Sequence, residues 1–461
     1  MNEKFQYEQN NLLQNYLDRY EKDSESVELI ISSECDQKCE YCYLYKHGHK
    51  TYTPESNNKD NILHNLPIIL EYVYENFPKV HDYDMFSGEF FNLSYWSQVF
   101  EILYDFFNRH NLTGQTIGVP TNMSFLWDVE KTQEVEKWIY KFKEQKNYLY
   151  LSASVDGPTE LEDLERPSKK TDKNYSKTEW YYDTLFKFLA KHQYAAHPMI
   201  TRNFVKNYKE NYDFWIDMSF KYPSVFEKSN GQKIVGVPMF LEVRDAEQWD
   251  DESIENYKKF LWYVAEKDLK TVHKGNVQEL IYRIADDFTE NMTSLGEYCT
   301  CQPYIIGIPQ PNNRIPCSIQ GGPVFRVGDL AIVPCHRTCY PNLVYGHFEM
   351  ENDKITGVVA NNPLLAYKIK TFNPLRSMLR CSSCLINAFC IKGCIGSQYE
   401  HLGELFSSDE RVCKMFFAKY KTIHEIALHY DLYEKVKHDI QIPAERREFI
   451  EYARTIFDRI Q

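Results

Sequence analysis

Three cysteines lie within eight residues near the start of the chain, at Cys35, Cys39 and Cys42. A cubic iron–sulfur cluster usually takes four thiolates, so three thiols without a fourth nearby would leave one iron open to a ligand from outside the protein. Zinc is the alternative, because it takes four Cys or His ligands, and His47 and His49 follow closely. The triplet therefore predicts a metal centre and leaves its kind open.

The other cysteines gather in the second half of the chain. Of the 13 cysteines, none lies between residues 43 and 298, and ten lie between residues 299 and 413. The odd total, and an N-terminus without the features of a secretory signal, argue against a disulfide framework. We expect a cytoplasmic protein with two cysteine-dependent modules and an ordinary fold between them.

The bulk composition argues against two kinds of partner. The chain of 461 residues has a formal net charge of −13 and a sequence pI near 5.6, so general binding of nucleic acid through phosphate neutralisation is not expected. No apolar run approaches the roughly 18 residues that a membrane-spanning helix needs, so no membrane partner is expected either.

The cysteine-free span alternates strand-like and helix-like segments. Apolar strands separated by helices predict an α/β fold, with a parallel sheet that is either open or curled into an incomplete (βα) barrel. The predicted strands are residues 27–32, 83–88, 116–121, 148–155, 195–201 and 235–243. The predicted helices lie near residues 60–76, 96–109, 129–145, 178–193, 206–219 and 252–268.

The first cysteine motif resembles that of the radical S-adenosylmethionine (radical SAM) family. The family pattern is Cys-x3-Cys-x2-Cys after the first barrel strand, with an aromatic residue before the third cysteine, and Tyr41 occupies that position. The resemblance implies a [4Fe–4S] cluster on Cys35, Cys39 and Cys42. The open iron would bind S-adenosylmethionine, whose reductive cleavage gives a 5′-deoxyadenosyl radical.

A second likeness lies in the loop after the second predicted strand. Ser87, Gly88 and Glu89 resemble a Gly-Gly-Glu-Pro motif whose acid holds the ammonium group of S-adenosylmethionine. Phe90 replaces the proline of that motif.

The next two strand ends continue the resemblance. Thr121 and Asn122 match a Thr-Asn-Gly signature in which Met123 replaces the glycine. Ser154 and Asp156 match a Ser-x-Asp-Gly-Pro signature whose serine can reach the ribose. Because these matches follow successive strands in order, they favour an S-adenosylmethionine site at one edge of a parallel sheet.

A further pair points to the peptide-modifying branch of the family. Asp163 and Arg166 have the spacing of an Asp-x-x-Arg pair of that branch. An arginine suits carboxylate recognition, because its fork can bond both oxygens.

The C-terminal cysteines resemble the SPASM motif, which holds auxiliary [4Fe–4S] clusters. Carried over, one cluster would use Cys381, Cys384, Cys390 and Cys413, and the other would use Cys317, Cys335, Cys394 and either Cys301 or Cys299. A zinc ribbon is the alternative by spacing alone. Cys339 stays unassigned, with a plain buried thiol as the favoured interpretation.

The resemblance implies a domain order with three [4Fe–4S] clusters in all. We expect an incomplete (βα)6 TIM-like barrel followed by a small cysteine-rich SPASM domain and C-terminal helices. The expected boundaries are a helical lead-in at residues 1–26, the barrel at 27–270, a linker helix at 271–298, the SPASM domain at 299–415 and the helical segment at 416–461.

The leading functional hypothesis is a peptide maturase that abstracts hydrogen from a precursor peptide and leaves a crosslink or an oxidised residue. Two alternatives stay open: a dehydrogenase of a small-molecule alcohol or sugar, and a non-catalytic zinc or iron–sulfur scaffold that binds a partner peptide. A flavodoxin or ferredoxin would supply electrons, and a separate protein could bind the leader of the peptide.

One residue beside the second module is a candidate base. In sulfatase-maturating relatives an aspartate directly follows the second SPASM cysteine and acts as the base, whereas His336 stands there in this chain. Imidazole can accept a proton near neutral pH, so His336 is the candidate, with a packed histidine as the alternative.

Overall fold

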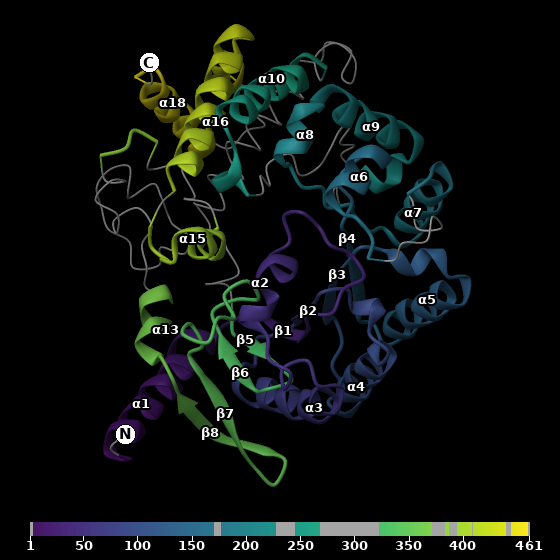
Figure 1. Ribbon diagram of the computed structural model, residues 1–461, viewed down its shortest axis with the longest axis vertical. Helices are drawn as coiled ribbons and strands as arrows, with labels where there is room; N and C mark the ends of the chain where they lie inside the picture. The colour runs from purple at the N-terminus through teal and green to yellow at the C-terminus, as the bar shows by residue number, and fades with distance from the viewer. Residues whose placement is uncertain are drawn as a thin grey trace. The chain divides into compact units, whose positions relative to one another are not determined.

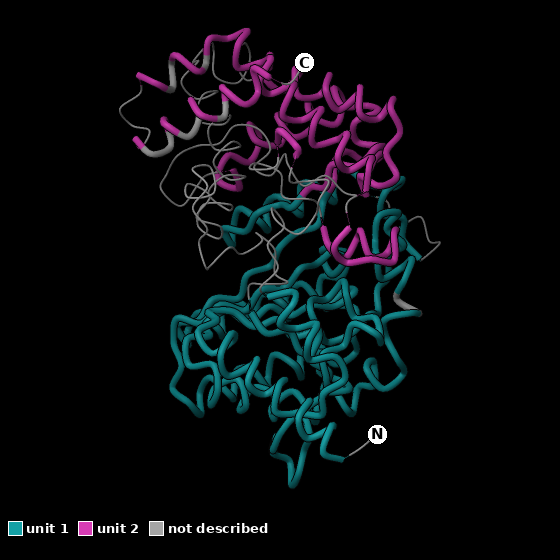
Figure 2. The backbone as a smooth tube through the Cα atoms, turned by 90° about the vertical axis from the view of Figure 1, so that its left-hand side faces the viewer, with its two compact units in different colours: residues 1–155, 162–197, 318–370 teal, residues 156–161, 198–317, 371–461 magenta. Residues whose placement is uncertain are grey.

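The computed structural model describes residues 3–169, 177–226, 245–267, 322–370, 383–386, 394–407, 409–438 and 444–459. The chain divides into two compact units (Figure 2). The first comprises Met1–Val155, Glu162–His197 and Ser318–Lys370, and the second comprises Asp156–Leu161, Pro198–Cys317 and Thr371–Gln461. Among the described residues, no helix is long and apolar enough to cross a membrane.

The first unit is built on an eight-stranded sheet with the order β4-β3-β2-β1-β5-β6-β7-β8 (Figure 1). β1 to β4 are mutually parallel and β5 is parallel to β1, whereas β5 to β8 pair antiparallel. The strands are β1 (Ser26–Ser32), β2 (Asp82–Ser87), β3 (Thr116–Thr121), β4 (Tyr148–Ala153), β5 (Val324–Arg326), β6 (Ala331–Val333), β7 (Gly346–Glu351) and β8 (Lys354–Ala360).

Helices connect the parallel strands and cover the outer face of the sheet (Figure 1). Two of them begin where the sequence offers a cap: the side chain of Asn58 accepts from the N–H of Asn61, and that of Asp128 accepts from the N–H of Lys131. The helices of this unit include α1 (Glu3–Tyr16), α2 (Tyr43–Thr51), α3 (Lys59–Asn76), α4 (Trp96–Arg109), α5 (Val129–Glu144), α7 (Glu179–His192) and α13 (Pro363–Lys370), with 3₁₀ turns η2 (Phe90–Asn92) and η3 (Ser124–Trp127). α6 (Thr159–Glu165) spans the division between the units.

The second unit is helical in its described parts. α10 packs against α16, and the 3₁₀ turn η6 packs against α16 as well. Its elements are α8 (Arg202–Lys206), α9 (Tyr208–Lys221), η5 (Pro223–Phe226), η6 (Ala246–Gln248), α10 (Asp251–Lys267), α15 (Ile395–Leu402), α16 (Glu410–His429), α17 (Leu432–His438) and α18 (Ala444–Phe457).

Four of the six predicted strands are confirmed as β1 to β4. Residues 195–201, predicted as a strand, form single bridges at Ala196 and Ile200 instead of a continuous strand, and Ala196 is paired in parallel with Ala153. Pro198 has no N–H to donate to a ladder, and Thr201 already caps α8 by accepting from the N–H of Phe204. The strand predicted at residues 235–243 and the linker helix predicted at 271–298 lie outside the described residues.

The antiparallel extension β5 to β8 was not expected, and α1 completes it. Side chains of α1 reach the last residue of β8, where Asn10 Oδ1 accepts from the N–H of Ala360 and Gln6 Nε2 donates to its carbonyl. After the end of α1, Glu21 forms an ion pair with Lys370, the last residue of α13. The Lys370 ammonium lies 2.9 Å from both carboxylate oxygens, and both side chains are buried. The bonds from Asn10 and Gln6 satisfy peptide groups that an edge strand would otherwise leave unpaired.

A row of side chains crosses the parallel strands in register. Glu28 of β1 is opposite Asp84 of β2, which is opposite Gly118 of β3, which is opposite Tyr150 of β4. A Cβ on Gly118 would lie 2.3 Å from Asp84 Oδ1, so a larger residue at this position would require the Asp84 carboxylate to move. Burial and then the charges of Glu28 and Asp82 raise the pKa of Asp84 to about 7, although His336 acts in the opposite direction.

The raised pKa of Asp84 predicts a pH-dependent stability. A carboxyl that binds its proton more strongly in the folded state stabilises the fold below its unfolded pKa, and this contribution is lost as the pH rises through the folded value near 7. The free energy of unfolding of the unchanged protein should therefore fall between pH 5 and pH 8. Over this range Asp84→Asn should become more stable than the unchanged protein by about 2 kcal/mol, measured by urea denaturation. Glu101→Gln, at an exposed position on α4, is the matched control, and parallel pH profiles for Asp84→Asn and the unchanged protein would contradict the prediction.

Candidate active site

The predicted site residues of the first unit gather where the parallel strands end. The cysteine triplet lies in the loop between β1 and α2, Glu89 follows β2, Thr121 ends β3, and Ser154 follows β4. Because the strands are parallel and in register, these positions share one edge of the sheet. The structure thus brings together the motifs that the sequence placed on successive strand ends.

Glu89 is the best-defined group at this edge. Its carboxylate is fully buried and accepts three hydrogen bonds, from the hydroxyl of Thr121 at 2.8 Å, the N–H of Asn122 at 2.6 Å and the N–H of Phe91 at 3.2 Å. Two of these donors belong to the end of β3 and one to η2, so the carboxylate ties the two strand ends together. Such donors favour the charged form of a buried acid.

A second buried acid stands beside Glu89, and the sequence analysis missed it. Asp36 Oδ1 accepts from Asn122 Nδ2 at 2.7 Å, so Asn122 bridges the two carboxylates through its side chain and its backbone N–H. Burial, and after it the charge of Asp36, raise the pKa of Glu89 to about 7. Asp36 lies inside the cysteine triplet, but its type alone gave no sign of this contact.

Gly88 allows the Glu89 loop to pack against the start of the cysteine loop. A Cβ on Gly88 would lie 2.1 Å from the carbonyl oxygen of Glu34, and the neighbouring N–H of Glu89 donates to the same oxygen at 2.7 Å. The adjacent Ser87 hydroxyl is buried without a hydrogen-bond partner among the described residues. A buried hydroxyl without a partner is a candidate contact for a bound molecule.

A basic group lies on another side of the cysteine loop. Arg166 donates to the hydroxyl of Tyr41 at 2.6 Å, and its Nε lies 3.8 Å from Glu162. Glu162 is fully buried and also pairs with the buried Lys177. Asp163, the predicted companion of Arg166, is exposed.

Ser154 and Asp156 fall on the two sides of the division between the compact units. Ser154 lies in the first unit, where its N–H donates to the carbonyl of Thr121 at 2.8 Å. Asp156 belongs to the second unit, is fully buried, and accepts from the N–H of Met199 at 3.0 Å. Its role in holding a cofactor stays a prediction.

The three thiols of the triplet are the donors that a metal centre in this loop would use. Over the described segments, no three Cys, His, Asp or Glu side chains converge closely enough to hold one metal ion. In a cubic cluster each thiolate would bind a different iron. Burial, followed by the charge of Glu89, raises the pKa of the Cys35 thiol, so a thiolate there needs a cation such as a bound metal centre.

The second cysteine module is described only in part. Cys335 follows β6, Cys394 caps α15, and Cys413 lies in the first turn of α16. Together with Cys384, these residues form no disulfide. The predicted ligands Cys301, Cys317, Cys381 and Cys390, and the alternative Cys299, lie outside the described residues.

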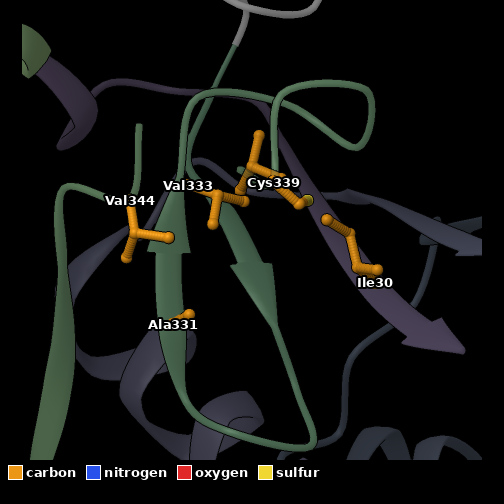
Figure 3. Close-up of a cluster of buried hydrophobic side chains, with 6 residues drawn as sticks. Ile30, Ala331, Val333, Cys339 and Val344 are labelled. Carbon is orange, nitrogen blue, oxygen red and sulfur yellow. The ribbon is translucent and has the colours of Figure 1, made fainter. Parts of the chain in front are cut away.

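Cys339 is a core residue. It is fully buried in an apolar cluster with Ile30, Val333 and Val344 (Figure 3). Burial raises the pKa of its thiol to about 12, which disfavours a thiolate. The structure thus supports the interpretation of Cys339 as a plain buried thiol.

His336, the candidate base, is held by a partner that the sequence analysis missed. Glu28 Oε1 lies 2.9 Å from His336 Nδ1 and accepts the backbone N–H of the same residue at 2.8 Å. The ring stacks on Phe86, with centroids 4.0 Å apart and planes at 10°. A ring that donates from Nδ1 presents Nε2 as an acceptor, which is compatible with the predicted role.

Comparisons with known proteins find the likeness in structure rather than in sequence. No protein-family model and no curated protein matches the chain. The structure of histidine-tagged anSMEcpe with bound AdoMet matches with a TM-score of 0.51 at 16% identity, covering 94% of this chain and 98% of that chain. Streptococcus suis SuiB bound to S-adenosylmethionine matches with a TM-score of 0.47 at 13% identity, covering 88% and 78% of the two chains.

The likeness to anSMEcpe, an anaerobic sulfatase-maturating enzyme of the radical SAM/SPASM kind, extends over nearly the full length of both chains. At 16% identity it establishes the fold. The chain therefore has the fold of a radical SAM/SPASM enzyme, which confirms the resemblance that its cysteine motifs indicate.

Proposed function

We propose that this chain is a radical SAM peptide maturase. The observation that carries the proposal is the presence of opposite charges around the cysteine loop: the buried acids Glu89 and Asp36, joined through Asn122, and the buried Arg166, which contacts Tyr41. An amino acid zwitterion such as the methionyl part of S-adenosylmethionine has the complementary ammonium and carboxylate.

The first unit would hold the cofactors through its own residues. Cys35, Cys39 and Cys42 would ligate the cluster, Glu89 would accept hydrogen bonds from the ammonium, and Ser87 and Ser154 offer hydroxyls. When bound, the cluster supplies the electron that cleaves S-adenosylmethionine to methionine and a 5′-deoxyadenosyl radical. The buried position of Glu89 keeps water from competing for the ammonium.

The finer architecture belongs to the same proposal. We assign the parallel strands to an incomplete (βα)6 barrel at residues 27–270, followed by a SPASM domain at 299–415 with two auxiliary [4Fe–4S] clusters. These clusters would take up or return an electron while the product forms. A flavodoxin or ferredoxin would be the external donor, and a separate protein could bind the peptide leader.

A peptide substrate is supported by the relative with the same fold. The structure of anSMEcpe has also been solved with bound AdoMet and the Kp18Cys peptide. The 5′-deoxyadenosyl radical would abstract hydrogen from a side-chain carbon or an α carbon of the peptide. The substrate of this chain would be a short precursor peptide.

Iron analysis tests the cluster assignment. Anaerobically reconstituted protein should contain about twelve iron atoms with matching sulfide, and a Cys35/Cys39/Cys42→Ala variant should contain about eight. With S-adenosylmethionine and dithionite, only the unchanged protein should form 5′-deoxyadenosine, measured by mass spectrometry. Cys339→Ala removes a core thiol instead and should keep both properties. Zinc without sulfide would contradict the assignment and favour a metal-binding scaffold.

Glu89 should contribute most to binding of S-adenosylmethionine. Glu89→Gln removes the charge that an ammonium needs, so we expect binding to the reconstituted protein to weaken about 10- to 100-fold, measured by isothermal titration calorimetry. Glu40→Gln, an exposed glutamate of the same loop, should bind as the unchanged protein does. Equal affinity of all three proteins for S-adenosylmethionine would show that Glu89 does not contribute to its binding.

The substrate class can be tested directly by mass. Peptides encoded by short reading frames beside the gene should undergo a mass change that requires both S-adenosylmethionine and the cysteine triplet. A small alcohol or sugar that is oxidised under the same conditions, with every peptide unchanged, would overturn the peptide assignment in favour of a dehydrogenase.

A further inference from the structure

The cysteine loop is paired along its length with a segment more than 120 residues away in sequence. The N–H of Lys38 donates to the carbonyl of Pro167 at 2.9 Å, and the N–H of Glu40 donates to the carbonyl of Glu165 at 2.8 Å. In the opposite sense, the N–H of Lys169 donates to the carbonyl of Asp36 at 2.7 Å. Together with an antiparallel bridge between residues 37 and 168, these bonds fix the backbone of the cysteine loop against residues 165–169.

Two basic side chains of this segment reach the two ends of the loop. The Lys169 ammonium donates to the carbonyl of Cys35 at 2.9 Å, and Arg166 donates to the hydroxyl of Tyr41 at 2.6 Å. Cys35 and Tyr41 bracket the loop, because Tyr41 directly precedes Cys42. The segment therefore fixes both the backbone and the ends of the loop that carries the thiols.

The segment itself is anchored in the interior. Glu162, one turn before Arg166, is fully buried and pairs with the buried Lys177. Arg166 is also buried, and its Nε lies 3.8 Å from the same carboxylate. A displaced segment would leave these charges in the interior without their partners, which is costly, so the anchor resists movement.

We propose that residues 165–169 are a clamp that shapes the cysteine loop, with Arg166 and Lys169 as positioning residues that also keep positive charge beside the bound cluster. The part that concerns the cluster rests on the proposed function. A cluster held by three thiolates is anionic and becomes more so on reduction, so nearby cations stabilise the reduced state and raise the reduction potential. The clamp would thus help an external donor to deliver the electron.

The test compares Lys169→Gln with Lys38→Gln in the full-length reconstituted protein. Lys38 lies inside the loop and is exposed, and its ammonium contacts no acceptor of the described residues, so its variant controls for charge alone. Lys169→Gln should lower the midpoint potential of the triplet cluster, followed by electron paramagnetic resonance, and should speed hydrogen exchange at the amides of residues 36–40 about tenfold. Lys38→Gln should leave the exchange rates unchanged and should shift the potential less than Lys169→Gln does.

Tyr41→Phe tests the other end without altering a charge. It removes only the oxygen that accepts from Arg166, so exchange at the same amides should accelerate while Arg166 itself is retained. This variant keeps the proposal testable if Lys169→Gln does not fold.

The outcomes separate the clamp from the proposed function. A triplet cluster whose potential and loop exchange are the same in Lys169→Gln as in the unchanged protein overturns the clamp and leaves the proposed function intact. Equal shifts in Lys38→Gln overturn it too, because any nearby charge would then suffice. If the unchanged protein holds no iron and sulfide at the triplet, the proposed function and the electrostatic part of the clamp fail together, and the exchange rates still decide whether residues 165–169 shape the loop.

Discussion

The buried carboxylate of Glu89 is the constraint on which the candidate site depends. An acid without water around it needs donors, and the ends of β2 and β3 supply three of them. Those donors are in place only when β2 and β3 keep their register, in which Asp84 lies opposite Gly118. The register is fixed in turn by alternation, since a slip of one residue would turn the buried Tyr83 and Met85 to the other face.

Charge around the cysteine loop is arranged by elements far apart in the chain. Asp36 and Glu89 are joined through Asn122, whereas Arg166 and Lys169 come from the segment after α6. Arg166 also lies 3.8 Å from Glu162, and Lys169 donates to the carbonyl of Cys35. Charges of opposite sign beside one loop fit a zwitterionic ligand.

The regular elements of the cysteine-free span could be predicted because each has its own periodicity. In α4, for example, Val99, Phe100, Leu103 and Phe107 form one buried face, and the helix lies where the sequence placed it. The hairpin of β7 and β8 was missed although it carries a signal. Its turn residues Asn352 and Asp353 have φ values of 51° and 58°, which asparagine and aspartate tolerate in two-residue hairpin turns.

Residues that act through distant partners could not be predicted in the same way. Glu28 reads as an interior strand residue, and only the fold shows that it holds His336, which is 308 positions away. Lys169 reads as an exposed lysine, and its contact with the carbonyl of Cys35 depends on how the chain returns after α6. The cysteine motif needed no such information, because its ligands are close together in sequence.

The two departures from the family motifs can be understood from the backbone. Met123 has a φ of 59°, a left-handed conformation that glycine adopts freely and that costs other residues roughly 1–2 kcal/mol. Its side chain is fully buried, and its N–H donates to the Thr121 hydroxyl at 3.0 Å, so burial and this bond offset the strain. The turn therefore keeps the N–H of Asn122 directed at Glu89, as a glycine at this position would allow.

Phe90, in the place of proline, is fully buried and begins η2, whose first turn Glu89 caps by accepting from the N–H of Phe91. In both places a packed apolar side chain replaces an intrinsic backbone preference, and the donors around the carboxylate are retained.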